Sequence, residues 1–155
     1  AKFMQMVKDT KKEFLLMNKL EGRVDTETDE VTRNFVRGGG ILKSIYEASS
    51  DFKVNINGLW QSITPEHLPK FVTELQGDGG EVRLAKKIYQ NMAISDRKVV
   101  FISLVDPTIS RYNRSDIIVK NQNFAESMAE FFEQCWNKAE TAEEFSQSFA
   151  RSLKG

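Results

Sequence analysis

Residues 80–106 read GEVRLAKKIYQNMAISDRKVVFISLVD, and this stretch decides the fold. Val82 and Leu84 alternate with charged residues, and apolar runs follow at 92–94 and 99–104. Alternation and short runs rich in β-branched residues are typical of strands, so we predict three successive strands. Asp96 suits a tight turn between the last two strands, because its short carboxylate can accept hydrogen bonds from its own backbone.

Charged side chains are expected at the ends of these strands. They are Arg83, Lys86, Lys87, Asp96 and Arg97. Ligands of α/β sheets bind where strands end. We therefore take Arg83, Lys86, Asp96 and Arg97 as candidate ligand-binding residues. Arg83 alternates with core residues, so the alternative for its side chain is an ion pair at an end of the sheet.

Length and composition limit the classes of protein to which this chain can belong. A length of 155 residues suits one domain, 1–155, with a real hydrophobic core. The 22 basic and 22 acidic residues cancel, which argues against strong sequence-independent binding of nucleic acid but leaves room for a separate DNA-binding module. Cys135 is the only cysteine, so no internal disulfide is possible and a reducing, cytoplasmic setting is expected. No apolar run approaches the ~20 residues that span a membrane.

Helices and strands are predicted to alternate before residue 80. The elements are a helix over 1–12, a strand over 13–20, a loop over 21–29, a helix to Arg37, a strand over 41–47 and a helix over 64–76. One longer helix to Leu20 is the alternative to the strand over 13–20. Thr26 or Thr28 can cap the second helix, and the glycines after Arg37 end it. Segment 48–60 holds turn residues and no clear pattern.

Two helices are predicted to close the chain. After a polar loop, 117–119 reads as a short edge strand, and Asn121 or Asn123 can cap a helix running to about Ala139. Thr-Ala-Glu-Glu at 141–144 is a capping box that opens a final helix. The prediction is therefore an α/β fold, a mixed β-sheet flanked by helices. Its core is 13–139, and its terminal helices are 1–12 and 141–154.

Catalytic and metal-binding motifs are absent from this sequence. His67 is the only histidine; it falls in a predicted helix, and nothing pairs it with a nucleophile. One histidine and one cysteine cannot supply the usual zinc ligands, and no phosphate-binding glycine motif precedes a helix. Cys135 lies on an apolar helix face, which indicates a core residue rather than a nucleophile. We expect neither a metal nor another cofactor.

Several segments together carry a resemblance to a known family. They are RGGGILKSIYE (37–47), LQGDGGEVRL (75–84), NMAISDRKVVFISL (91–104) and NFAESMAEFFEQCWNKA (123–139). Over about residues 30–139 the chain resembles the effector-binding domain of TrmB-like and related LuxR-type transcription regulators of bacteria and archaea. Those domains are similar to half of a phospholipase D fold. The resemblance implies such a half, with 141–154 as a C-terminal helical extension.

The phospholipase D likeness also predicts whether the chain is an enzyme. That family uses His-x-Lys-x4-Asp, in which the histidine is the nucleophile and the lysine holds phosphate. With Asp96 in the aspartate place, this chain has Tyr89 in place of the histidine and Asn91 in place of the lysine. The resemblance therefore implies a scaffold without catalytic activity.

The function implied by this resemblance is ligand sensing in a transcription regulator. The expected ligand is a small polar effector such as a sugar or metabolite, and Tyr46 and Trp60 could stack on it or simply fill the core. We find no helix-turn-helix, so DNA binding is expected only through a helix-turn-helix outside this fragment. The alternative is a protein-interaction or dimerisation module without a small-molecule ligand.

A homodimer is expected from the apolar residues of the terminal helices. We predict that Phe124, Met128, Phe131 and Cys135 face the sheet, with Phe132 and Trp136 beyond them. The final helix adds a seam of Phe145, Phe149 and Leu153, and the first helix adds Phe3, Met6 and Val7. The alternative is that this seam packs on the chain's own core.

Overall fold

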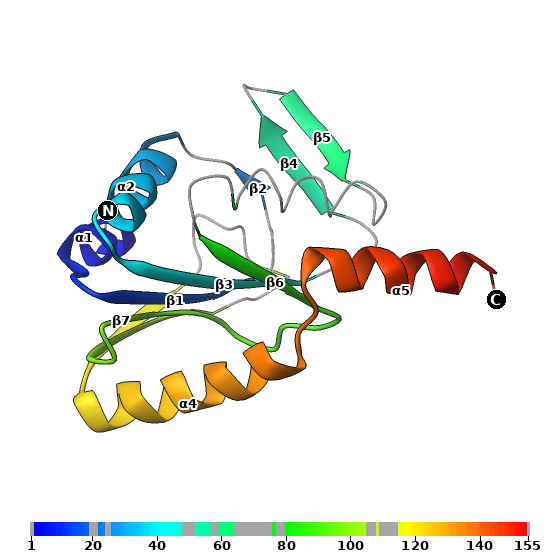
Figure 1. The fold of residues 1–155 in the computed structure, drawn as a ribbon. Helices are drawn as coiled ribbons and strands as arrows, with labels where there is room; N and C mark the ends of the chain where they lie inside the picture. The colour runs from blue at the N-terminus through cyan, green and yellow to red at the C-terminus, as the bar shows by residue number, and fades with distance from the viewer. Residues whose placement is uncertain are drawn as a thin grey trace.

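Six strands form one mixed sheet, and helices lie on both of its faces (Figure 1). The structure is a computed structural model, and it describes residues 2–18, 22–23, 26–47, 52–56, 59–63, 76, 80–104, 108 and 115–154. The helices are α1 (Lys2–Asp9), α2 (Thr26–Arg37), α4 (Gln122–Lys138) and α5 (Ala142–Lys154). The strands of the large sheet are β1 (Glu13–Asn18), β3 (Ile41–Glu47), β6 (Glu81–Ala85), β7 (Asn91–Ser95), β8 (Val99–Ser103) and β9 (Asp116–Lys120). A smaller sheet holds β2 (Gly22–Arg23), β4 (Phe52–Ile56) and β5 (Leu59–Ile63).

The order of strands in the large sheet is β6-β3-β1-β7-β8-β9. The first three strands are parallel to one another, and each later pair is antiparallel. The strand ends therefore form two opposite sides of the sheet. At one side, which we call the carboxyl edge, β1, β3, β6 and β8 end while β7 and β9 begin. At the other side, the amino edge, β1, β3, β6 and β8 begin while β7 and β9 end.

Two hydrophobic clusters fill the faces of this sheet. On one face, Phe132 and Trp136 of α4 pack with β-strand residues such as Leu15, Ile45 and Val100. On the other face, α1 contributes Met6 and Val7, which pack with Phe14 and Ala93. Val31 and Phe35 of α2 border this second cluster. Apolar side chains therefore fix both helical layers against the sheet.

Most of the predicted elements are confirmed. Residues Glu13–Asn18 of the predicted strand form β1 rather than part of a longer helix, and the three strands after residue 80 all form. Asn121 caps α4, because its side chain accepts a hydrogen bond from Phe124 N–H. Thr141 and Glu144 exchange the hydrogen bonds of a capping box. Gly39, at φ 96°, ends α2 in the left-handed conformation that glycine permits.

Three parts of the prediction differ from the structure or lie outside its described residues. Strand β2 falls within the predicted loop at 21–29, and it pairs with β4 at only two positions. The unclear segment at 48–60 contributes β4 and the start of β5, which pair as a hairpin. The predicted helix at 64–76, which contains His67, lies outside the described residues except for Gln76.

The predicted sheet-facing side of α4 is only partly right, because Phe124, Met128 and Cys135 pack against the core while partly buried, and the centre of the buried side lies elsewhere. Phe131 is 40% exposed, whereas Phe132 is 0% exposed and Trp136 is also buried. The prediction followed the large side chains and overlooked Ala125 and Ala129, which are fully buried on the same stripe as Phe132 and Trp136. Small side chains let a helix approach a sheet closely, so the alanines set the rotation of α4.

The first terminal helix packs on its own domain. Met6 and Val7 are buried, and Phe3 makes edge-to-face contacts with Phe14 and Phe101. The α1 stripe is therefore part of the core, and it is not available as half of a dimer seam. The side chains of Phe149 and Leu153 lie outside the described residues. Within the described part of the chain, no helix is long and apolar enough to cross a membrane.

Candidate ligand-binding site

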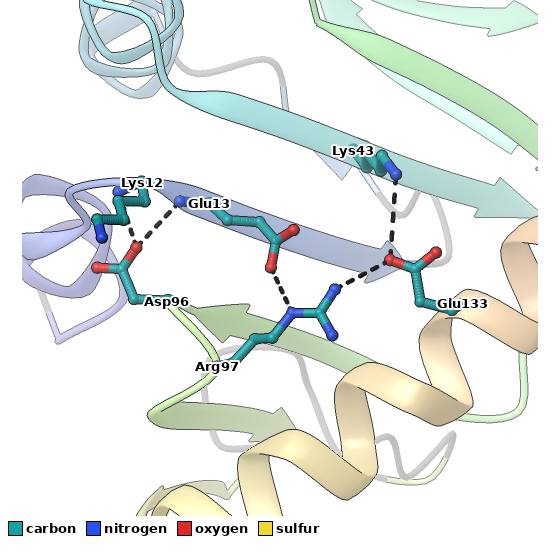
Figure 2. A network of polar contacts seen from close by, with 6 residues as sticks. All are labelled: Lys12, Glu13, Lys43, Asp96, Arg97 and Glu133. Carbon is teal, nitrogen blue, oxygen red and sulfur yellow. Dashed lines mark hydrogen bonds and ion pairs between the residues drawn. The ribbon is translucent and has the colours of Figure 1, made fainter.

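The turn between β7 and β8 is built on two residues with left-handed backbones. Asp96 has φ 50° and Arg97 has φ 53°, and the turn is closed by a hydrogen bond from Lys98 N–H to the Ser95 carbonyl oxygen at 2.9 Å. The predicted tight turn is confirmed, but its carboxylate binds the backbone of a distant segment rather than the backbone of its own turn. Asp96 accepts hydrogen bonds from the backbone N–H groups of Lys11, Lys12 and Glu13, at 2.9, 2.8 and 3.0 Å. Figure 2 shows the bonds from Lys12 and Glu13. Asp96 therefore joins this turn to the segment between α1 and β1.

The ionisation of Asp96 reflects those contacts. Burial alone would raise the pKa of this carboxyl group, because a charged group loses solvation. The three backbone N–H groups favour the ionised form and outweigh burial, so the pKa lies below its ordinary value of 3.8. The ionised carboxylate thus stabilises the contact between the β7–β8 turn and the beginning of β1.

Arg97 is engaged in ion pairs on the α4 side of the sheet. Its guanidinium group donates to Glu13 at 2.9 Å and to Glu133 at 3.2 Å (Figure 2). The hydrogen bond to Glu13 raises the pKa of Arg97, against the effect of burial, and the nearby carboxylates add to the increase. Lys43 reaches the same Glu133 oxygen at 4.0 Å. This network links the turn and β3 to α4.

Arg83 holds the end of α4. Its Nη1 donates to the carbonyl oxygen of Trp136 at 2.8 Å, and its guanidinium carbon lies 4.5 Å from the centre of the Trp136 ring. Lys43 Nζ lies 5.5 Å from the same ring. A cation beside the last carbonyls of a helix also interacts favourably with the helix dipole. Arg83 is the middle residue of β6, so it does not lie at a strand end.

The six candidate ligand-binding residues do not meet at one place. Asp96 and Arg97 lie at the amino edge, and Arg83 faces α4. Tyr46 and Lys86 lie at the carboxyl edge, one near the end of β3 and the other directly after β6. The two edges are separated by the five residues of β7, roughly 16 Å. Trp60 belongs to β5 in the smaller sheet, and its side chain lies outside the described residues.

A row of polar residues crosses the sheet at the carboxyl edge. In register, Asn18 of β1 pairs with Tyr46 of β3, Asn91 of β7 pairs with Ser103 of β8, and Ser103 pairs with Asp116 of β9. The β1–β7 register places Asn18 beside Asn91, since Met17 pairs with Met92. The members of this polar row are Tyr46, Asn18, Asn91, Ser103 and Asp116.

All five side chains of the polar row point to one face of the sheet. Side chains alternate between faces along a strand. Phe14, Ala93 and Phe101 belong to the cluster on the α1 and α2 face. Their neighbours two and four residues away, among them Asn18, Asn91 and Ser103, therefore lie on that face. At roughly 4.8 Å between strands, the row extends across five strands, or about 19 Å.

The polar row has few charges but basic neighbours. Asn91 is only 9% exposed, and the Gln90 side chain donates to the carbonyl oxygens of Asn91 and Ser103. Lys86 and Lys87 are exposed in the connection to β7, where Lys87 Nζ lies 4.8 Å from the ring centre of Tyr89. Hydroxyl and amide groups on a sheet, with lysines beside them, can hydrogen-bond a sugar or a small anion.

Sequence reasoning missed four members of the polar row as ligand candidates. Asn18 and Ser103 end their strands, and Asn91 and Asp116 each begin one. A polar residue at the end of an apolar run was the available signal, but pairing in register was needed to place the residues together. Among the described residues, no three His, Cys, Asp or Glu side chains gather closely enough to hold a metal ion. Cys135 is half-buried, and burial raises the pKa of its thiol.

Comparison with known proteins identifies the fold. No family model and no curated protein sequence matches the chain. Among solved structures, Nuc from Salmonella typhimurium, a phospholipase D family member, aligns with a TM-score of 0.63 at 12% identity, over 89% of this chain and 86% of that one. NucT from Helicobacter pylori aligns with a TM-score of 0.59 at 10% identity, over 90% and 88%. The chain has a phospholipase D-like fold.

Another solved structure, that of a chromatin protein, also aligns with this chain. TrmBL2, an archaeal chromatin protein with a novel mode of DNA binding, aligns with a TM-score of 0.62 at 22% identity. The alignment covers 90% of this chain but 49% of that one, so this chain spans about half the length of TrmBL2. At such identities the likeness establishes the fold alone. The fold predicted from the sequence is therefore confirmed.

Proposed function

We propose that this phospholipase D-like domain is a non-catalytic sensor that binds a small polar effector, such as a sugar or metabolite, within a TrmB-like or LuxR-type transcription regulator. DNA binding would then belong to a helix-turn-helix outside this fragment. The likeness to TrmBL2 supports the regulator class. The polar row supports a ligand at the carboxyl edge, because ligands of α/β sheets lie outside the carboxyl ends of strands.

The non-catalytic proposal rests on the side chains that occupy the positions of the His-x-Lys-x4-Asp motif. Tyr89, in the place of the nucleophilic histidine, is 80% exposed, and its phenol is a poor substitute for an imidazole. Asn91, in the place of the phosphate-holding lysine, is neutral. Asp96 lies at the far end of β7, where it binds three backbone N–H groups. Tyr89 and Asn91 can bind a polar ligand but cannot supply the nucleophile of the phospholipase D motif.

A phosphodiesterase assay tests the absence of catalysis. We expect no turnover of bis(4-nitrophenyl) phosphate above the buffer rate. The matched controls are Asn91→Ala at the edge that would react and Arg97→Gln at the opposite edge. Turnover that is lost in Asn91→Ala and kept in folded Arg97→Gln would show that the domain is an enzyme.

A thermal-shift screen tests effector binding. The panel contains neutral sugars, polyols, dicarboxylates and nucleoside phosphates, each tested separately. A ligand at 100 times its dissociation constant adds about 2.7 kcal/mol to the free energy of unfolding. We expect a shift from at least one polar compound, and no shift across the panel would count against the effector.

The competing function is a protein-interaction or dimerisation module without a small ligand. Apolar exposure at Ile117, Leu104 and Phe131 favours this reading, since each is at least 40% exposed. The two functions are compatible if the sensor is a homodimer, which we include in the proposal. Two-fold symmetric regulators suit two-fold symmetric operators.

A further inference from the structure

In the part of the chain that the structure describes, strand β9 is an open edge of the large sheet. It is the last strand in the sheet order, and among the described residues only β8 pairs with it. The opposite edge strand, β6, is partly closed, because Leu84 exchanges two backbone hydrogen bonds with Glu140. An open edge of β-branched residues is a ready template for another strand.

The backbone groups that β9 presents to this open side can be identified. Leu104 N–H donates to the Ser115 carbonyl oxygen at 3.0 Å, in the same register that pairs Ser103 with Asp116. Hydrogen-bonded pairs alternate along an antiparallel ladder. Ile117 and Val119 therefore bond to β8. The alternate residues, Asp116, Ile118 and Lys120, direct their N–H and C=O groups outward.

We propose that β9 pairs with β9 of a second copy of this chain, antiparallel about a two-fold axis at Ile118. This register places the outward backbone groups of Ile118 against those of the other Ile118. It places Asp116 of one copy opposite Lys120 of the other, and the reverse. Each of these pairs can exchange both of its main-chain hydrogen bonds. The large sheets of the two copies become one continuous sheet.

The charges of β9 select this partner. Asp116 and Lys120 have the same parity as Ile118, so their side chains share one face and meet across the two-fold axis. Opposite charges directly across an antiparallel pair stabilise it, and like charges destabilise it. In the same register Ile117 meets Val119 of the second copy on the other face. The strand is thus complementary to itself in charge and in shape.

An apolar surface beside the open edge supports the same partner. On α4, Phe124, Met128, Phe131 and Cys135 lie roughly 140–180° around the helix from Glu133. Glu133 faces Lys43 of β3, so this apolar flank turns toward the β8 and β9 side of the sheet. Phe131 is 40% exposed, and Ile117 on the same sheet face is 43% exposed. A second copy related by the axis at Ile118 would cover Ile117 on this face.

Charge reversal tests the pairing. Asp116→Lys puts two lysines opposite each other across the axis, and Lys120→Asp does the same with two aspartates. We expect each variant alone to dissociate at least about tenfold more readily than the wild type. An equimolar mixture of the two variants restores both opposite-charge pairs, so we expect it to form a heterodimer. Glu81→Lys, on the other edge strand, is the matched control and should dimerise like the wild type.

Sedimentation equilibrium without added ligand measures the dissociation constant of the dimer for the wild type, each variant and the mixture. The inference is overturned by a wild type that remains monomeric at several hundred micromolar, by single variants that dimerise normally, or by a mixture of variants that remains monomeric. Rescue in the mixture also excludes unfolding as the cause of the single-variant loss. The inference rests on the homodimer proposed above but not on the effector, and the thermal-shift screen decides the effector separately.

Discussion

The carboxylate of Asp96 accepts a hydrogen bond from the backbone N–H of Lys12 at 2.8 Å, although the two residues are 84 positions apart. The same carboxylate binds the N–H groups of Lys11 and Glu13, the first residue of β1. Strands β1 and β7 are neighbours, so this contact fixes the end of β7 against the beginning of β1. One aspartate thus sets the register of the central strands at the amino edge.

Replacing Asp96 should destabilise the fold. In Asp96→Ala three N–H groups lose their acceptor and a non-glycine residue without a polar side chain must keep a positive φ. We expect a loss of about 2–4 kcal/mol in the free energy of unfolding, measured by urea denaturation. Asp96→Asn keeps one acceptor oxygen and a tolerance of the left-handed backbone, so its loss should be about 1–2 kcal/mol.

The control for this prediction is Lys98→Ala in the same turn. The Lys98 side chain is exposed, and its backbone N–H donates to the Ser95 carbonyl oxygen at 2.9 Å. Its loss should stay within about 0.5 kcal/mol. Equal losses in the Asp96 and Lys98 variants would contradict the role assigned to the carboxylate.

The contribution of Asp96 should depend on pH. Its folded pKa is lower than its ordinary value of 3.8, so the ionised form stabilises the folded state. This contribution is fully present well above pH 3.8 and is lost as pH falls through the folded pKa. The difference in unfolding free energy between wild type and Asp96→Asn should be constant from pH 7 to about 5 and shrink below 3.8. A difference that grows in acid would refute the assignment.

Local patterns predicted most of the fold because they act over a few residues. Alternation identified β6, and the capping residues Asn121 and Thr141 located the starts of α4 and α5. The rotation of α4 escaped prediction, because it depends on how closely Ala125 and Ala129 approach the sheet. A pattern that ranks residues by apolar size undervalues alanine at a tight contact.

Arg83 should contribute to stability rather than to ligand binding. Its guanidinium group both caps α4 through Trp136 O and stacks on the Trp136 ring. Arg83→Met should therefore reduce the unfolding free energy by about 1–2 kcal/mol, since the hydrogen bond and the cation–π contact are both lost. Lys86→Met, which changes an exposed charge on the following connection, should change it by less than about 0.5 kcal/mol. A larger effect at Lys86 than at Arg83 would contradict this division.

The site was harder to predict than the fold, because a site depends on which strands become neighbours. Asp96 and Arg97 have the residue types of a ligand site, yet their partners come from 84 and 36 positions away. Asn18 and Asn91 have ordinary sequence surroundings, and only the antiparallel pairing of β1 with β7 brings them together. Residue type alone therefore could not separate the structural charges from the polar row.

The polar row predicts that residues at the carboxyl edge bind the ligand, whereas residues at the amino edge stabilise the fold. If a compound from the polar panel shifts the melting temperature, Asn91→Ala and Lys86→Ala should weaken its binding by tenfold or more, about 1.4 kcal/mol, because a buried amide and a neighbouring cation are removed. Arg97→Gln, at the amino edge, should leave the dissociation constant within about twofold while lowering the melting temperature. Isothermal titration calorimetry measures the first effect and circular dichroism the second. Loss of binding in Arg97→Gln, with binding retained in Asn91→Ala, would move the ligand to the opposite edge of the sheet.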